Sequence, residues 1–393
     1  MKDRLTRLFV EFVESEQASG VILIACTIAS ILIANSPVGK GFSDFWHMKV
    51  GIEIGDSHLK YSVEVLINDG LMAIFFLLIG LEIERELYVG ELSGLRNATL
   101  PVFAAIGGMA TPALFHFLLN RGTETQAGFG IPMATDIAFA LGVLSLLGNR
   151  VPVSLKIFLA ALAIIDDLGA IVLIALFYVG DVSFLYLALA MGVFGGLLVL
   201  NRLGVDNLLV YLILGLIMWY FMLRSGVHAT LAGVLLAFAI PFRNGDEQSP
   251  SYTLQHFLHK PVAFIIMPLF ALANTAIPLT GSLIKGLATS NSLGILAGLC
   301  IGKPVGIVLF TLLAVKSRLS QLPSEVSWKH IIGVGVLGGI GFTMSIFIAM
   351  LAFDNPEIRH SAKISILLSS LLAGTTGFLI LSRQGSDVSN RSR

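Results

Sequence analysis

Long apolar stretches separated by short polar segments cover almost the whole chain. A helix needs about 20 mostly apolar residues to cross the hydrocarbon core of a bilayer, and most of these stretches have about that length. The pattern therefore predicts about twelve transmembrane helices. We expect them at 18–35, 63–87, 98–119, 125–147, 152–178, 183–200, 206–222, 225–241, 256–278, 292–314, 329–352 and 360–382.

The segment between the first two predicted helices has a different pattern. Val50–Ile54 and Leu59–Val63 alternate between apolar and polar residues, and Gly55-Asp56-Ser57 lies between them. Two alternating runs joined by a turn predict a small external β-hairpin at about 48–65. Because a lone hairpin is only marginally stable in water, its free edge could pair with a second copy of the chain. It could equally be an ordered loop packed on its own subunit.

The composition indicates an all-α polytopic membrane protein. Of 393 residues, 55% are hydrophobic and 13% are charged, whereas soluble domains average about 25% charged residues. This excludes a soluble globular protein, a disordered chain and a secreted disulfide scaffold, and both cysteines lie in apolar runs. Because 25 basic residues balance 25 acidic ones, no basic surface points to nucleic acid. Twelve spans with short loops make residues 1–393 a single membrane domain.

Basic residues outside the spans predict the orientation. The side that holds both chain ends has sixteen Lys and Arg residues, and the other side has eight. Short loops rich in Lys and Arg face the cytoplasm, so both termini are expected there. Glu11 and Glu14 precede the first apolar stretch and no clear cleavage site follows it. We therefore expect a retained helix rather than a cleaved signal peptide.

Charged side chains are expected inside several spans, among them Asp69, Asp136, Asp166, Asp167 and Lys303. Each costs roughly 2.5–3.5 kcal/mol at the centre of a membrane helix, so such residues usually line a transport pathway and pair with one another. A buried salt bridge that only fixes helix register is the alternative. One base cannot neutralise four acids, however, so at least three acids lack a permanent counter-charge.

The adjacent pair Asp166-Asp167 is the sharpest feature. Neighbours on a helix project about 100° apart, so one carboxylate can face a counter-charge while the other faces a cavity. Hard cations prefer oxygen ligands, and a carboxylate can hold either a proton or a metal cation. Competition between the two is the chemistry of ion exchange.

Two predicted spans are interrupted. In the fourth, Gly128, Gly130 and Pro132 come shortly before Thr135-Asp136, and the eleventh has a glycine-rich stretch, 333–343. Backbone freed by such a break is tolerated at membrane depth only where it is packed by protein or lines water, and Asp136 can offset the positive end of a half-helix. A simple proline kink is the alternative.

The two halves of the chain match in a further respect, because the fifth span bears the acids and the tenth bears Lys303. Paired interruptions in two halves are typical of transporters built from inverted repeats, here helices 3–5 and 10–12.

Five short motifs follow one another over nearly the whole chain. They are Phe75–Glu82 (Phe-Phe-Leu-Leu-Ile-Gly-Leu-Glu), Ala134–Phe139 (Ala-Thr-Asp-Ile-Ala-Phe), Ala163–Gly169 (Ala-Ile-Ile-Asp-Asp-Leu-Gly), Ser225–Thr230 (Ser-Gly-Val-His-Ala-Thr) and Gly302–Pro304 (Gly-Lys-Pro). Together and in this order they resemble the NhaA-type sodium/proton antiporters. Paired interruptions are known partly from this family, so they do not support the resemblance independently.

The resemblance implies an architecture and an ion site. It implies twelve helices, crossed broken helices 4 and 11, and a homodimer joined through the 48–65 hairpin in a bacterial inner membrane. It makes Asp167 the principal Na⁺ ligand and proton carrier, with Asp166 as a partner that can pair with Lys303. Thr135 and Asp136 then belong to the crossing, and Asp69 lies on the external ion path.

Four further residues match positions that the family links to the cytoplasmic funnel or to the pH response: Glu82, Glu86, His228 and His256. The sequence alone leaves simpler interpretations open. The two acids could lie at a solvated helix end, His228 could be a hydrogen-bonded packing residue, and His256 could lie at the membrane interface. Gln255 departs from the family, because members can carry an acid there.

The favoured function is a secondary Na⁺(Li⁺)/H⁺ antiporter, not an enzyme, with no cofactor. We expect alternating access, exchange that moves net charge if Lys303 or both carboxylates release protons, and activation at alkaline pH. An intramembrane aspartyl protease would use Asp136 with Asp166 or Asp167, but the chain has no Gly-x-Gly-Asp sequence. A channel would leak cations without proton coupling. An ATP-driven pump is disfavoured, because no Gly-x-x-x-x-Gly-Lys-Ser/Thr loop occurs.

Overall fold

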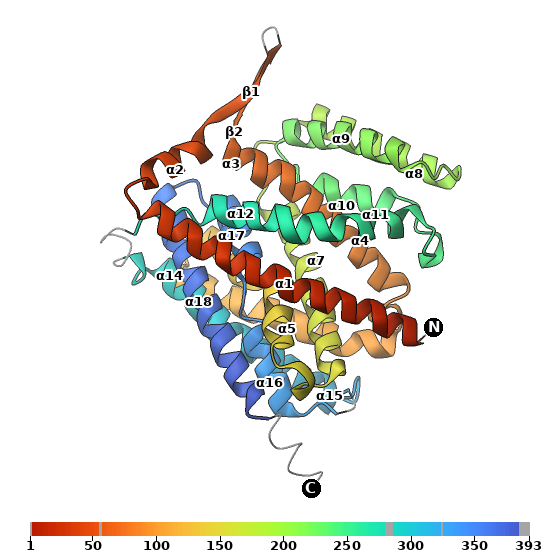
Figure 1. The fold of residues 1–393 in the computed structure, drawn as a ribbon, viewed down its shortest axis with the longest axis vertical. Coiled ribbons are helices and arrows are strands. Elements are labelled where there is room, and N and C mark those ends of the chain that lie inside the picture. Colours follow the sequence, from red (N-terminus) through yellow and green to blue (C-terminus); the bar gives the residue numbers. More distant parts are fainter. Residues whose placement is uncertain (1, 55–56, 280–285, 324, 385–393) are drawn as a thin grey trace. The chain divides into compact units, whose positions relative to one another are not determined.

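The computed structural model describes residues 2–54, 57–279, 286–323 and 325–384, and this part of the chain is mostly helical (Figure 1). It divides into two compact units. The first unit comprises Met1–Val21, Glu91–Ala170 and Thr280–Arg393, and the second comprises Ile22–Gly90 and Ile171–Leu279. Two long helices, α1 (Lys2–Ala34) and α7 (Val153–Phe177), contribute residues to both units.

The other helices of the first unit come from two separate stretches of the chain. The first group is η2 (Glu91–Ser93), α5 (Leu95–Leu119), η3 (Gln126–Met133), α6 (Ile137–Ser145) and η4 (Gly148–Arg150). The second group is α14 (Ser290–Ala297), η7 (Gly298–Gly302), α15 (Lys303–Lys316), α16 (Trp328–Leu337), α17 (Phe342–Ala352) and α18 (Pro356–Ser382).

The second unit holds the described strands and the remaining helices. Its first part is α2 (Gly39–His47), β1 (Lys49–Ile54), β2 (Ser57–Ser62), α3 (Val63–Val65), η1 (Leu66–Leu71) and α4 (Met72–Tyr88). Its second part is α8 (Phe184–Arg202), α9 (Leu208–Ser225), α10 (Leu231–Ala239), η5 (Arg243–Gly245), α11 (Pro250–Pro261), η6 (Val262–Ile266) and α12 (Met267–Asn274).

The number of membrane spans can be compared with the twelve predicted. Nine described helices are long and apolar enough to cross a membrane, or eleven elements if each of two bent pairs is one span. The remaining predicted span, 225–241, contains only the nine-residue α10. Gly226 has a φ of 83°, in the left-handed region, and ends α9, and α10 starts only at Leu231. Nine residues span about 14 Å, half of a hydrocarbon core.

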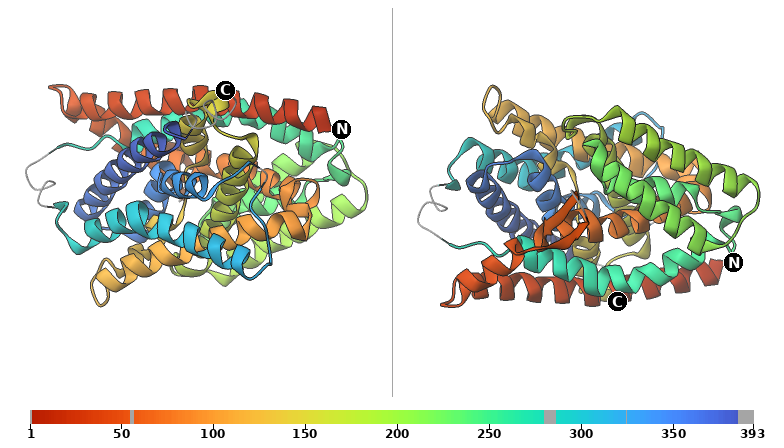
Figure 2. Two further views of the ribbon diagram at one scale, coloured as in Figure 1. Left: turned by 90° about the horizontal axis from the view of Figure 1, so that it is seen from below. Right: turned by 90° about the horizontal axis from the view of Figure 1, so that it is seen from above.

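Close backbone contacts hold the first unit together. The α5 helix runs alongside the α14–α15 segment (Figure 2). A Cβ added to Gly306 would lie 2.0 Å from the carbonyl oxygen of Gly107, so neither position tolerates a side chain without a shift. In a bilayer the hydrophobic effect does not drive helices together, so close packing depends on such small residues. This contact fixes α15 on α5 close to Lys303.

The predicted hairpin is present in the second unit. Strands β1 and β2 pair antiparallel from Lys49 opposite Ser62 to Ile54 opposite Ser57, and the ribbon extends away from α2 and α3 (Figure 1). Residues 55 and 56 of the predicted turn lie outside the described residues. Alternation of apolar and polar residues therefore predicted these strands correctly.

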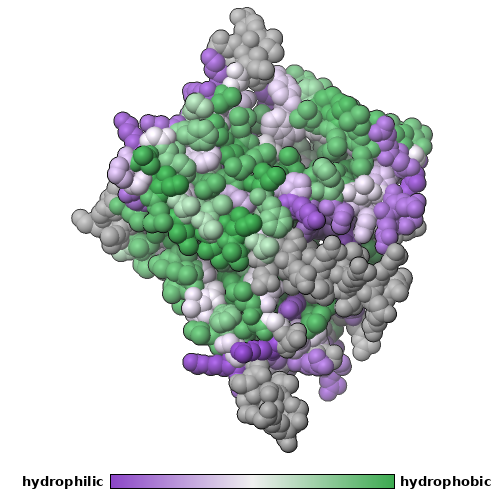
Figure 3. All heavy atoms as spheres, in the orientation of Figure 1, coloured by the Kyte–Doolittle hydropathy of each residue, from purple (hydrophilic) through white to green (hydrophobic). Residues whose placement is uncertain are grey.

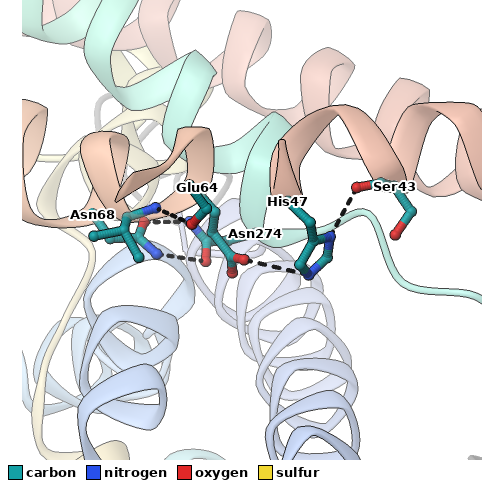
Figure 4. Close-up of polar contacts among 7 residues, drawn as sticks. Ser43, His47, Glu64, Asn68 and Asn274 are labelled. Carbon is teal, nitrogen blue, oxygen red and sulfur yellow. Dashed lines mark hydrogen bonds and ion pairs between the residues drawn. The ribbon is translucent and has the colours of Figure 1, made fainter. Parts of the chain in front are cut away.

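Polar contacts support the base of the hairpin (Figure 4). The ring of His47 contacts the carbonyl oxygen of Ser43 at 2.8 Å and the carboxylate of Glu64 at 3.7 Å. Nearby, the Asn274 amide donates to the side-chain oxygen of Asn68 at 2.8 Å. Helix α2 and the start of the second predicted span are therefore linked by side chains of the same unit.

Apolar side chains also cover part of the second unit's surface. The surface over α8 and α9 is largely hydrophobic (Figure 3). Exposed residues there include Phe184 and Leu185 on α8 and Leu209, Ile213 and Leu216 on α9. Such a surface suits contact with lipid rather than water. The structure thus supports the all-α polytopic membrane class with a small sheet.

Candidate functional site

A buried ion pair lies within the first unit. The ammonium Nζ of Lys303 lies 2.8 Å from Oδ2 of Asp166, and both side chains are completely buried. Lys303 Nζ also donates to the carbonyl oxygen of Met133. Charges are costly in such surroundings unless they are paired and hydrogen-bonded. The pair therefore accounts for Asp166, one of the acids that the sequence places inside spans.

Thr135 completes the surroundings of Asp166. Its hydroxyl oxygen lies 2.6 Å from Asp166 Oδ2 and 3.0 Å from the carbonyl oxygen of Gly338. A hydroxyl has one hydrogen, so it donates to one of these acceptors at a time. Asp166 Oδ1 has no hydrogen-bond partner among the described residues. Asp166 is thus bound on one oxygen and has a lone pair available on the other.

Asp167 follows Asp166 on α7 and is also buried, with 2% of its surface exposed. Lys303 is attracted by its carboxylate as well as by that of Asp166. Lys303 also contacts Asp166 directly, as described above. Because neighbours on a helix project about 100° apart, the two adjacent carboxylates leave α7 in different directions.

The interrupted fourth span is broken, not merely kinked. Residues 126–133 form a 3₁₀-helix that contains Pro132, residues 134–136 are not helical, and α6 begins at Ile137. Runs of 3₁₀-helix longer than three or four residues are uncommon and often mark strain or a hinge. The eleventh span bends by 46° between α16 and α17. Both interruptions fall where the glycines and proline predict them.

Asp136 joins the two breaks. Its Oδ1 accepts the backbone N–H of Phe139 at 3.0 Å and caps α6. Its Oδ2 accepts the backbone N–H of Thr343 at 3.1 Å and the Thr343 hydroxyl at 2.5 Å, in the first turn of α17. The Asp136 N–H donates to the carbonyl oxygen of Ile340 at 2.7 Å. One carboxylate therefore offsets the positive ends of two half-helices, which confirms the predicted capping and extends it to a second helix.

The structure brings four predicted site residues together: Thr135, Asp136, Asp166 and Lys303 meet through the two breaks, with Asp167 next to them. Sequence reasoning missed Thr343 and the carbonyl groups of Met133 and Gly338. A hydroxyl residue directly after a glycine-rich break is a capping signal, and it could have identified Thr343. Nothing in the sequence indicates which carbonyl groups a break exposes.

The other predicted residues belong to the second unit. Asp69 lies in the π-helical η1, where its carbonyl oxygen accepts the indole N–H of Trp219 at 2.9 Å. Glu82 and Glu86 are half-buried on α4. His228 is half-buried, and its Nε2 has no hydrogen-bond partner among the described residues. His256 is exposed, and its ring stacks on Tyr252 with 6.4 Å between centroids.

Glu84 is a further acid that sequence reasoning missed. It lies on α4 between Glu82 and Glu86, is 6% exposed, and contacts the Ser251 hydroxyl of α11 at 3.4 Å. The guanidinium of the neighbouring Arg85 lies over the Tyr252 ring, 5.8 Å from its centroid. The sequence of residues 82–86 does not reveal which of these acids faces inward.

Comparison with known proteins gives a consistent result. A family model described as Na⁺/H⁺ antiporter 1 matches residues 10–381. The Na⁺/H⁺ antiporter NhaA of Flavobacterium psychrophilum is 59% identical over 378 residues, which cover 96% of each chain. The NhaA of Dechloromonas aromatica is 58% identical over 383 residues, again 96% of each chain. Among solved structures, the sodium proton antiporter MjNhaP1 of Methanocaldococcus jannaschii is similar at TM-score 0.42 and 17% identity, covering 94% of this chain and 99% of that one; a similarity at this level carries no argument about function.

Proposed function

Since the chain belongs to the Na⁺/H⁺ antiporter 1 family, we propose that it exchanges Na⁺ or Li⁺ for protons at Asp166 and Asp167. One observation carries this proposal. A fully buried Lys303–Asp166 pair lies beside a second buried carboxylate, and one oxygen of Asp166 has no partner among the described residues. This arrangement supplies oxygen ligands for a hard cation. It also supplies a positive side chain, Lys303, that can separate from Asp166 when the cation binds.

Asp167 is the principal ligand and proton carrier in this proposal. The buried carboxylate of Asp167 can hold either a proton or a cation, and both cannot occupy the same oxygen. Binding of Na⁺ therefore requires release of the proton, and protonation on the opposite side of the membrane releases Na⁺. This competition couples the two fluxes without any covalent chemistry.

Asp166 and Lys303 add a second step. When Asp166 turns its charge toward Na⁺, Lys303 loses its direct partner in a fully buried position, where an unpaired ammonium is costly. Lys303 then gives up a proton. If this proton leaves together with that of Asp167, two charges leave for each Na⁺ bound and the exchange is electrogenic. It then responds to voltage at about 2.3 kcal/mol per charge per 100 mV.

The broken spans suit alternating access. Asp136 links α6 and α17 through hydrogen bonds to Phe139 and Thr343, and Thr135 links the same region to Asp166. Binding of Na⁺ or a proton at Asp166 is thereby connected to the backbone at both breaks. We assign the core repeats to helices 3–5 and 10–12, because the first unit collects the described helices of both groups.

The remaining predicted residues have proposed roles in access and in the pH response. Asp69 lies on the external path, and Glu82, Glu86, His228 and His256 serve the cytoplasmic funnel or the pH response. Protons compete with Na⁺ at the carboxylates, so exchange is weak in acid and strong at alkaline pH. Changing Gln255 to Glu and His228 to Ala tests for a separate sensor. A large shift of the pH profile at unchanged Na⁺ affinity would show one, and an unchanged profile supports competition alone.

The cellular setting follows the family. We propose a multi-pass protein of the bacterial inner membrane with both termini in the cytoplasm, and a homodimer joined through the 48–65 hairpin. The antiparallel β1–β2 ribbon extends from its unit, which supports edge-to-edge pairing of two copies. Deletion of the hairpin tip should convert the dimer into monomers in a mild detergent, as size-exclusion chromatography with light scattering would show.

Transport in proteoliposomes tests the function. With an imposed pH gradient, Na⁺ or Li⁺ should collapse the gradient, K⁺ serves as the comparison cation, and the rate should depend on a valinomycin-clamped potential. A cation leak that leaves the pH gradient intact would indicate a channel instead. An exchange rate and end point independent of the potential would refute the electrogenic step alone.

A further inference from the structure

A second buried polar cluster lies in the first unit, where the last turn of α5 meets the first turn of α14. His116 is completely buried, and its Nε2 lies 3.0 Å from Oδ1 of Asn291, which is 2% exposed. Because an amide oxygen only accepts hydrogen bonds, Nε2 carries the hydrogen and donates it. Asn120 adds a second link, since its amide donates to the carbonyl oxygen of Ser290 at 3.1 Å.

This cluster contributes little to the stability of the fold. His116 Nδ1 and Asn291 Nδ2 have no hydrogen-bond partner among the described residues. A buried polar atom without a partner is unfavourable, whereas two apolar side chains of the same shape are tolerated well. Polar contacts between membrane helices are, however, directional and fix which residues face each other. The pair therefore specifies the register of α14 on α5 more than it strengthens the contact.

The cluster lies on the same helix face as the contacts to Lys303. On α5, Gly108, Pro112 and His116 follow one another at intervals of four residues and share a face. A Cβ added to Gly108 would lie 4.0 Å from Cγ of Lys303, and one added to Gly302 would lie 2.9 Å from Cα of Pro112. His116 is two turns, about 12 Å, beyond Gly108 along this face. The whole face packs on the segment that ends in Lys303.

The packing at His116 itself is tight. A Cβ added to Gly294, one turn after Asn291, would lie 2.8 Å from Cδ2 of His116. One added to Gly128, in the 3₁₀ part of the broken fourth span, would lie 3.0 Å from Cε1 of the same ring. The imidazole is therefore held between α14 and η3. It cannot follow a shift of α14 without disturbing both.

A π-helix separates Asn291 from Lys303. The segment Gly298–Gly302 is π-helical, and α15 starts directly after it with Lys303. A π-helical turn holds an extra residue and often occurs at functional sites. The Gly107–Gly306 contact fixes the far side of this segment. The His116–Asn291 hydrogen bond is placed to fix the near side.

We propose that His116 and Asn291 are positioning residues for the exchange reaction: they fix the tenth span on α5 and so hold Lys303 Nζ at Asp166. The inference rests on the proposed role of Lys303. Loss of the pair lets the π-helical segment adopt neighbouring registers. Lys303 then reaches Asp166 in only part of the molecules, and turnover falls although the fold persists.

The test compares three variants with the wild type. The double variant His116→Phe/Asn291→Leu replaces the polar pair by apolar side chains of similar shape. His116→Gln keeps a donor for Asn291, since its amide can take the place of Nε2–H. Thr311→Val is the matched control, because Thr311 is a fully buried polar residue on α15 whose hydroxyl has no hydrogen-bond partner among the described residues.

Each protein is melted in detergent and assayed for Na⁺/H⁺ exchange in proteoliposomes, per amount of folded protein. We expect the double variant to melt within about 3 °C of the wild type yet to turn over about tenfold more slowly, which corresponds to about 1.4 kcal/mol of activation free energy. His116→Gln and Thr311→Val should stay within about twofold of the wild-type turnover, a difference of about 0.4 kcal/mol.

Three outcomes would overturn the inference. Wild-type turnover of the double variant would show that the pair positions nothing, while the proposed exchange stands. A fall in melting temperature that parallels the fall in turnover would reduce the pair to a structural role. Absence of exchange by the wild type itself would refute the proposed function and this inference with it. If the double variant does not fold, Asn291→Leu and His116→Gln replace it, and equal turnover of these two would refute the positioning role.

Discussion

Replacement of Lys303 by methionine tests the buried ion pair directly. Methionine has a length similar to that of lysine but no charge, so Asp166 keeps the Thr135 hydroxyl and loses the ammonium 2.8 Å from its Oδ2. Removal of one partner of a buried pair costs about 3–5 kcal/mol, because the other charge is left uncompensated. We therefore expect Lys303→Met to destabilise the protein by that amount where Asp166 is ionised.

The size of the effect on melting can be worked out. Unfolding entropy is about 2.1 cal/mol/K per residue in globular proteins, which gives about 0.8 kcal/mol/K for a chain of 393 residues. A loss of 3–5 kcal/mol then lowers the melting temperature by about 4–6 °C. The loss should shrink in acid, because a protonated Asp166 no longer needs a counter-charge. Adding Asp166→Asn should restore most of the stability at alkaline pH.

Thermal unfolding in detergent at acid and alkaline pH, followed by tryptophan fluorescence, measures these values. The four proteins needed are the wild type, Lys303→Met, Asp166→Asn and the double variant, which form a double-mutant cycle. The reasoning would be refuted if Lys303→Met melted like the wild type at alkaline pH. It would also be refuted if the double variant were less stable than either single variant.

Three further predictions follow from the site. Asp167→Asn should abolish exchange in proteoliposomes, because an amide holds neither Na⁺ as a charge partner nor the transported proton; wild-type transport would refute the assignment. Asp136→Ala should lower stability by about 1–2 kcal/mol for each cap lost, measured by thermal melting, whereas Thr343→Val should lose only the hydroxyl contact and fall less. The exchange rate should rise with pH and its midpoint should shift toward acid as Na⁺ increases, because the two ions compete for one site; a midpoint independent of Na⁺ would argue for a separate sensor.

Much of the fold could be predicted from the apolar pattern, and the departures have physical reasons. Eleven of the twelve predicted spans correspond to described elements if bent pairs are counted as one. The predicted span at 225–241 is helical only in α10, because Gly226 takes a left-handed conformation and the chain stays non-helical to Thr230. Hydropathy depends only on the residue types. It therefore does not distinguish one long helix from a short helix preceded by an apolar loop.

The site could be predicted in part. A charge inside an apolar run is conspicuous, so Asp166, Asp167 and Lys303 stand out in the sequence alone. Their partners do not, because the carbonyl groups of Met133 and Gly338 become acceptors only once two segments more than 160 residues apart meet. Buried hydrogen bonds of His116 and Glu84 are equally invisible in the sequence. Residue type shows which groups can form contacts, and only the fold shows which of them do.

The Thr135 hydroxyl also bears on the speed of transport. It has a single hydrogen and two acceptors, Asp166 Oδ2 and the Gly338 carbonyl oxygen. While Asp166 carries its charge the hydrogen points to α7, and once the charge is neutralised the hydrogen is free to turn to the break in the eleventh span. Rotation of a side chain takes picoseconds to nanoseconds, whereas rearrangements of helices take microseconds to milliseconds. In the proposed alternating-access cycle, the backbone at the break would therefore sense the ionisation state of Asp166 within nanoseconds, and the movement of the helices would be the slow step.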